Sequence, residues 1–461
     1  MHGSRRANVR LRGLLQQAAM TQEALARGVN ALGHERGHRL FYDRTSVAHW
    51  LRGARPRPPA PDLITEVLSR RLGRPITVAA TGLAAPSDAE RDVSHSMDAA
   101  ERLARLSAWD VAPKYGEDLP GTPYSAVDVQ EQPIRERSAT PVLFDGPWGQ
   151  RRVPDDARMM LTCFTTLDAG YGGGYARPAL VRYLASDIAI QMKTKVDGPA
   201  WKELCATTIR LIALCGTMSM DTRLHHAAQS YYRTALDLAE QSPHSDARAL
   251  TLHRISIHAR FLGQRQEARG LAEAALEATP SHCANTARAQ RTAHLAACMA
   301  DLAEHRGARS QLRRAEGLLS EKSDASGTPE EQAIGQAEMH WRQAEVLGAR
   351  GASSEAVAAM RKTVGLLPPG HRRARLLARA RLAILLIDEG ETAQAAEVVS
   401  AFLDEAACVH SALVVSAHSD LYARCASLWA DSEGAAVRHH MLASRPPWEA
   451  EAPDRRWCCL C

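Results

Sequence analysis

The stretch that decides the fold opens with Thr21-Gln22-Glu23-Ala24-Leu25-Ala26 and closes with Asp43-Arg44-Thr45-Ser46-Val47-Ala48-His49-Trp50-Leu51-Arg52-Gly53. Threonine and aspartate side chains accept orphan backbone N–H groups, so Thr21 and Asp43 each predict the start of a helix. Gly53 and the prolines that follow it predict the end of the second helix. The stretch therefore predicts two short helices joined by a connector.

The second of these helices has one apolar face. Val47, Trp50 and Leu51 fall at i, i+3 and i+4, which predicts that they point into a core. The same periodicity predicts a flanking helix on each side. In the helix before the stretch the apolar positions are Leu11, Leu14, Leu15 and Ala18. In the helix after it, between Asp62 and Gly73, they are Leu63, Ile64, Val67, Leu68 and Leu72. Residues 1–80 are therefore expected to form a small domain of four to five helices.

The Thr21–Ala26 motif and a helix ending in Trp50-x-x-Gly53 resemble the lambda-repressor-like (XRE, Cro/C1-type) helix-turn-helix family. The resemblance implies a domain that binds double-stranded DNA, with the glutamine on a phosphate and the first turn of the second helix on base edges. Roughly ten extra residues, supplied by 33–40, lengthen the connector relative to the family's usual turn. In this it resembles a subgroup from high-GC filamentous bacteria, some of whose members regulate development and secondary metabolism. The candidate DNA-binding residues are Gln22, Arg44, Thr45, Ser46, His49, Arg52, Arg55 and Arg57.

Charge is unevenly spread along the 461 residues. The first 80 residues hold 14 arginines, no lysine and 5 acids, a balance of +9, so the rest of the chain carries −4 of the net +5. A basic end on a mildly acidic body is typical of a nucleic-acid-binding domain attached to a regulatory module.

A repeat follows the basic segment. Gly263, Gly307, Gly351 and Gly390 each precede an apolar residue by five positions, namely Ala268, Leu312, Ala356 and Ala395. The glycine lets the chain turn between antiparallel helices, and the small residue lets their backbones approach. This pattern resembles the tetratricopeptide repeat and implies an α-solenoid over residues 156–446. The alternative is a plain helical bundle.

The remaining segments complete an all-α prediction. Aromatics are only 5% of the chain, and no apolar run is long enough to span a bilayer. No signal core follows the basic N-terminus, so a cytoplasmic protein is expected. Residues 81–155 are expected to be a linker with one short helix, and 447–461 a tail that holds Cys458, Cys459 and Cys461. The other seven cysteines, expected to be buried and reduced, are Cys163, Cys205, Cys215, Cys283, Cys298, Cys408 and Cys425.

Three other motifs have ordinary explanations. His34-Glu35-Arg36-Gly37-His38 matches the zinc-protease pattern HExxH, which needs both histidines on one helix face, whereas the flanking glycines disfavour a helix. The glycine-rich segment 170–174 lacks the strand and lysine of a phosphate-binding loop and is interpreted as a hinge. Basic residues between 372 and 381 are typical of a solvated helix face, although they could also grip an anion. No metal, cofactor or catalytic residue is therefore expected.

The sequence favours a transcriptional regulator that binds DNA as a homodimer and is not an enzyme. Its repeat domain would dimerise, sense a peptide, protein or small ligand, or do both. The alternative is a protein-interaction scaffold that does not bind DNA. A third hypothesis is an enzyme that uses the HExxH motif or the cysteines.

Overall fold

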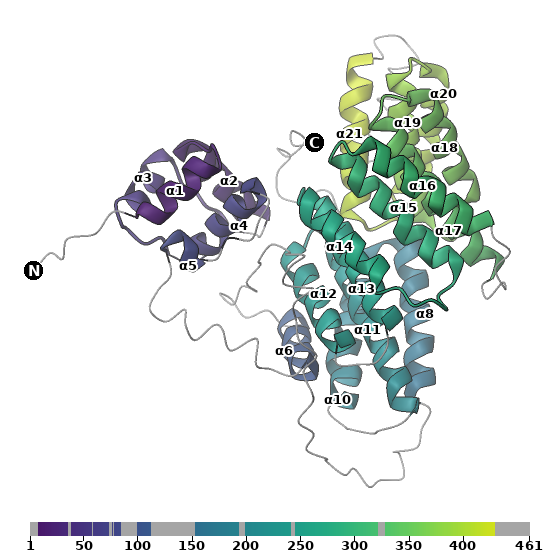
Figure 1. Cartoon of the computed structure of the whole chain (residues 1–461), viewed down its shortest axis with the longest axis horizontal. Helices are drawn as coiled ribbons and strands as arrows, with labels where there is room; N and C mark the ends of the chain where they lie inside the picture. Colours follow the sequence, from purple (N-terminus) through teal and green to yellow (C-terminus); the bar gives the residue numbers. More distant parts are fainter. Residues whose placement is uncertain are drawn as a thin grey trace, which may run out of the picture.

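The computed structural model describes residues 8–35, 38–57, 59–72, 76, 78–83, 99–111, 153–192, 199–240, 245–320 and 328–428. All regular secondary structure within these ranges is helical, which confirms the all-α prediction (Figure 1). Most of the expected linker, 81–155, lies outside them. So do the tail 447–461 and its cysteines Cys458, Cys459 and Cys461.

The N-terminal helices form a small bundle, drawn in purple in Figure 1. Leu11, Leu25, Leu63 and Trp50 meet in its core, and each is at most 4% exposed. Four helices occur where the apolar periodicity predicts them, and a short fifth one follows. They are α1 (Val9–Gln17), α2 (Gln22–Glu35), α3 (Arg44–Leu51), α4 (Ala60–Leu72) and α5 (Val78–Thr81).

Helix α2 is longer than its glycines suggest. The expected connector began at Gly33, but α2 continues through Gly33 to Glu35. A Cβ at position 33 would lie 2.5 Å from Leu40 Cδ1. Glycine is needed here because the chain that returns from α2 packs directly against the helix at this point, and that packing outweighs the cost of a glycine in a helix.

The larger body is an array of antiparallel helix pairs, which establishes the helical-repeat part of the prediction. It begins with α6 (Ala99–Val111), α8 (Val153–Tyr171), α9 (Gly173–Tyr183), the π-helical turn η2 (Leu184–Ile188) and α10 (Ala189–Gln191). The pairs that follow are α11 (Pro199–Asp221) with α12 (His225–Glu240), α13 (Ser245–Phe261) with α14 (Arg265–Glu277), α15 (Asn285–Asp301) with α16 (His305–Ser320), α17 (Pro329–Gly348) with α18 (Ser353–Leu366), and α19 (Arg372–Asp388) with α20 (Thr392–Ala406). Helix α21 (Ala412–Leu428) closes the described chain.

Helix α6 falls within the expected linker but belongs to the repeat body. Its Leu103 and Leu106 are buried in the same core as Leu180 of α9 and Tyr231 of α12. The one short helix expected within 81–155 is therefore present at Ala99–Val111, and it packs on the array as Figure 1 shows.

The repeat has a more regular register than the glycines alone indicate. The turn within each pair contains one residue with positive φ, and five positions later comes a fully buried alanine that lets the two helices approach. The turn residues are Arg223, Gly263, Ala303, Gly351 and Gly390, and the alanines are Ala228, Ala268, Ala308, Ala356 and Ala395.

The prediction for Gly307 and Leu312 was therefore wrong. Gly307 lies inside α16, and the turn is made by Ala303 at φ 60°. Gly307 instead accommodates a neighbouring side chain, because a Cβ there would lie 2.7 Å from Met299 Cε.

Candidate functional site

Helix α3 starts at a capping box. The Asp43 Oδ1 atom accepts the Ser46 backbone N–H at 2.8 Å and the Ser46 hydroxyl at 2.8 Å. The Ser46 Oγ atom in turn lies 3.4 Å from the backbone N–H of Asp43. The backbone N–H of Ser46, and then its hydroxyl, lower the pKa of Asp43 below its ordinary value. The first turn of α3 is therefore fixed by its own side chains, as the sequence predicted for Asp43.

The inward face of α3 is the predicted one. Val47 is fully buried, and Trp50 and Leu51 are 4% and 5% exposed. The Tyr42 ring meets Trp50 edge to face, with centroids 5.0 Å apart. This packing sets the rotation of α3 and so decides which residues face outward.

The outward face of α3 carries Arg44, Thr45 and His49, all exposed in the whole chain. Ser46 was expected among the base-reading residues, but it is half-buried and its hydroxyl belongs to the capping box. Ser46 is therefore assigned to stabilising the start of α3, and the exposed residues Arg44, Thr45 and His49 form the candidate contact surface.

Exposed arginines continue beyond α3. Arg52, Arg55 and Arg57 are all exposed, and Arg52 Nε donates to the Ala48 carbonyl at 3.2 Å. Gly53, at φ 93°, turns the chain away from the helix axis between them. Gln22 is half-buried at the first position of α2, just after Thr21, whose hydroxyl accepts the Ala24 backbone N–H at 3.1 Å.

A further arginine was missed in the sequence. Arg10 of α1 and Arg55 line one cavity of about 420 Å³, together with Asn8, Gly53 and Leu83. Nothing in the local pattern around Arg10 distinguished it from the other arginines, since the fold alone brings it beside Arg55.

The repeat domain leaves this face uncovered. A contact between the two bodies comes from α4, where Glu66 Oε2 lies 3.7 Å from His226 Nε2 of α12. Arg44, Thr45 and His49 on α3 remain exposed with the repeats present.

In the repeat body, a buried ion network joins the first helices to the last. Arg373 of α19 donates to both carboxylate oxygens of Asp168 on α8, at 2.6 and 2.7 Å. It also reaches Asp221 of α11 at 3.3 Å. Asp221 accepts the Gly173 backbone N–H at 2.8 Å and the Ser411 hydroxyl. Burial raises the pKa of Asp168, and the Arg373 guanidinium opposes that rise.

This network corrects two expectations. The basic run is only partly a solvated face. Arg381 is exposed, but Arg373 is half-buried against Asp168, and Arg375 and Arg379 both pair with Glu405. The glycine-rich segment 170–174 is a packed junction and not a hinge, because a Cβ at Gly173 would lie 2.8 Å from the Met218 backbone. These glycines are required where backbones touch.

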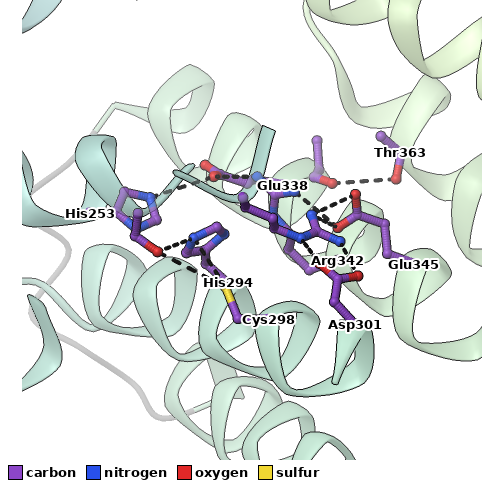
Figure 2. A network of polar contacts seen from close by, with 11 residues as sticks. His253, His294, Cys298, Asp301, Glu338, Arg342, Glu345 and Thr363 are labelled. Carbon is purple, nitrogen blue, oxygen red and sulfur yellow. Dashed lines mark hydrogen bonds and ion pairs between the residues drawn. The ribbon is translucent and has the colours of Figure 1, made fainter. Parts of the chain in front are cut away.

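A second network crosses α13, α15 and α17 (Figure 2). Glu345 accepts from Arg260 at 3.0 Å and from Arg342 at 2.9 Å, and Arg260 also donates to Asp301 at 2.6 Å. Burial would raise the pKa of Glu345, but the two guanidinium groups outweigh it and bring the pKa to about 2. The network locks neighbouring repeats together.

Beside it, His294 Nε2 lies 2.9 Å from Ser256 Oγ and 3.5 Å from Cys298 Sγ (Figure 2). Such a trio resembles a nucleophile with its base. However, burial raises the pKa of Cys298 to about 11 and lowers that of His294 well below its ordinary value. Near neutral pH both groups are uncharged, so the geometry does not favour a reactive thiolate.

Metal-binding patterns are not formed by the described residues. His34 is near the end of α2 while His38 lies beyond it, so the two histidines of HExxH do not share a helix face, and Arg36 and Gly37 lie outside the described ranges. No group of three or more His, Cys, Asp or Glu side chains in the described ranges could hold a metal ion. Within the same ranges no helix is sufficiently long and apolar to cross a membrane.

The cysteine expectation was partly wrong. Among the cysteines in the described ranges, Cys163 and Cys408 are exposed, and Cys283 is half-buried. Cys205, Cys215, Cys298 and Cys425 are buried, as expected, and all seven are free thiols.

Residues 11–84 match the family described as the SP15 N-terminal domain. No curated protein matches the chain. A crystal structure of a Rap protein complexed with Competence and Sporulation Factor is 12% identical, with a TM-score of 0.40, over 63% of this chain and 98% of that one. Aspartyl phosphate phosphatase F from Bacillus subtilis is 14% identical, with a TM-score of 0.37, over 68% and 86%. Scores this low carry no argument about fold or function.

Proposed function

We propose that the chain is a sequence-specific DNA-binding regulator and that α3 reads the DNA. The observation that carries the proposal is the capped helix whose apolar face is buried while Arg44, Thr45 and His49 stay exposed. None of the comparisons names DNA, so the proposal rests on this chain's own residues.

In this proposal the first turn of α3 enters the major groove, where an arginine can pair with guanine in a bidentate manner. Arg52, Arg55 and Arg57 follow the helix and would contact phosphates, as would Gln22 at the start of α2. Each neutralised phosphate releases counterions, so binding should weaken steeply as salt rises.

The repeat domain would supply dimerisation, a binding site for a peptide, protein or small ligand, or both. Two copies on paired half-sites would double the phosphate contacts and fix the half-site spacing. We place this regulator in the cytoplasm. Control of differentiation or secondary metabolism is the role that the helix-turn-helix resemblance implies.

The test uses the full chain and a labelled duplex selected from a random pool, with affinity measured by fluorescence anisotropy. The wild type should prefer the selected duplex to a scrambled one, and three arginine–phosphate contacts predict a slope of log affinity against log salt of about −3 per half-site. Arg44→Ala should lose about tenfold or more, the effect of one bidentate base contact. Arg350→Ala, an exposed arginine in the α17–α18 turn, is the matched control. Binding that ignores both sequence and salt would refute the proposal.

A second candidate function is a protein-interaction module that does not bind DNA. It is favoured by an exposed aromatic surface at the junction where α8 and α9 meet the loop before α21. Tyr171 and Tyr175 are 41% and 55% exposed with centroids 5.1 Å apart, and His410 and Arg372 border them. Tyrosine and arginine, together with tryptophan, are enriched among the residues that dominate binding energy at interfaces.

The occupant of this surface would be an extended peptide segment with an acidic side chain for Arg372. Peptides selected from a displayed library with the full chain should lose binding to Tyr175→Ala and to Arg372→Ala. They should keep binding to Phe261→Ala, an aromatic residue 47% exposed at the end of α13. Equal binding to all three variants would exclude this surface.

A further inference from the structure

Phe41 is the most exposed of the large apolar side chains in the described ranges, at 87%. It lies two residues before the Asp43 cap, so its Cα is at most about 11 Å from that of Arg44. Single exposed apolar side chains are common and need no explanation by themselves. What sets Phe41 apart is the way its neighbours are held.

Both neighbours of Phe41 are anchored to the core. The Asn30 side chain accepts the Tyr42 backbone N–H and donates to the Tyr42 carbonyl, each at 2.7 Å. The Tyr42 ring packs on Trp50, and Leu40 packs beside Gly33 of α2. The backbone at Phe41 is therefore fixed between two inward-facing residues, and the side chain points outward from it. Because the backbone is already ordered, only the torsions of the Phe41 side chain lose freedom on binding.

Two exposed arginines, Arg39 and Arg44, flank Phe41 in the sequence, and the acid between them, Asp43, is bonded to Ser46 in the capping box. An apolar protein surface gains nothing from contact with these arginines, whereas the phosphates of a polyanion are attracted to them. This charge complementarity favours DNA as the occupant.

We propose that Phe41 contacts the methyl group of a thymine next to the base pairs that α3 reads, an inference that rests on the proposed DNA-binding function. In the major groove the thymine methyl is the apolar group that base edges present, and phenylalanine is one of the side chains that contact it. Phe41 is then a specificity-determining residue for a T·A pair.

The experiment uses the full chain and its selected duplex, with each thymine in turn replaced by deoxyuridine, which keeps the hydrogen bonds and lacks the methyl. Wild type should lose about fourfold in affinity at one position, the effect of removing one buried methyl. Phe41→Ala should bind the thymine duplex more weakly and lose no affinity when that thymine is replaced by deoxyuridine. Phe41→Leu should keep part of the sensitivity to this replacement. Met159→Ala, 64% exposed on α8, is the matched control and should behave as wild type.

Phe41→Ala with wild-type affinity, or with unchanged sensitivity to deoxyuridine, would overturn this inference. If Arg44→Ala is impaired in the same assay, the DNA-binding proposal survives that result. If no duplex is selected at all, both fall together. Loss of a dimer in Phe41→Ala by light scattering, with methyl sensitivity intact, would assign the ring to a contact between copies and also overturn the inference.

Discussion

Replacing Arg373 with methionine removes the half-buried charge that faces two buried carboxylates and keeps most of the side-chain volume. Its guanidinium holds both oxygens of Asp168 and one of Asp221, whose residues are 5% and 1% exposed. Breaking a buried pair leaves uncompensated charge and typically costs about 3–5 kcal/mol. With an m-value of about 3 kcal/mol/M for a domain of this size, the urea midpoint of the repeat domain should fall by about 1–1.7 M.

The assay is urea unfolding of the full chain followed by circular dichroism, because most of the described helical residues lie in the repeat domain. Arg381→Met is the matched control, since Arg381 is an exposed arginine on the same helix. It should move the midpoint by less than about 0.2 M, as surface substitutions usually do.

The same variant has a predicted pH dependence. Burial raises the pKa of Asp168 even with Arg373 present, and Arg373 opposes that rise. Without the arginine the pKa rises further, so protonation neutralises Asp168 at a milder acidity in the variant. The loss of stability should therefore be full near pH 8 and smaller near pH 5. Two results would refute the role given to this network. One is a urea midpoint of the variant equal to that of wild type at pH 8, and the other is a difference between the two midpoints that widens on acidification.

Further predictions concern two glycines, the ion network around Glu345, and the exposed arginines that follow α3. Gly173→Ala should destabilise the repeat domain by about 2 kcal/mol in thermal unfolding, because the new Cβ would meet the Met218 backbone. Gly307→Ala should be neutral or slightly stabilising in the same assay, because its Cβ meets only the flexible end of Met299. Glu345→Gln should cost about 2 kcal/mol in urea unfolding. Since the folded pKa of Glu345 is about 2, below its ordinary 4.5, that difference should be full above pH 4.5 and shrink as the pH falls toward 2; a constant difference would exclude the pairing with Arg260 and Arg342. Arg57→Ala should reduce the salt slope of DNA binding by about one unit without changing base preference, and an altered preference would place Arg57 in a groove.

The sequence predicted what is decided locally. Thr21 and Asp43 mark helix starts because a cap needs only a side chain and the next turn of backbone. Val47, Trp50 and Leu51 were predicted as core residues because their spacing follows from helix geometry alone. The exposure of Arg44 and His49 on the opposite face follows from the same geometry.

Contacts between distant segments had no such signal. Arg373 and Asp168 lie 205 positions apart, and a run of arginines has the same local pattern whether it faces solvent or a buried carboxylate. The turn at Ala303 was missed because alanine seldom adopts positive φ, and only the packing of α15 on α16 requires it. Ser46 was placed on the contact surface because composition does not show that its hydroxyl is already bonded to Asp43.

The most direct measurement of the central claim compares the sequences that two chains select from one random duplex pool. Wild type should yield a defined motif, and Arg44→Ala should yield the same motif with the preference at one base pair lost. Such a change at a single position would show that α3 reads that base pair directly. Identical motifs from both chains, or no motif from wild type, would contradict the claim that α3 is the reading helix.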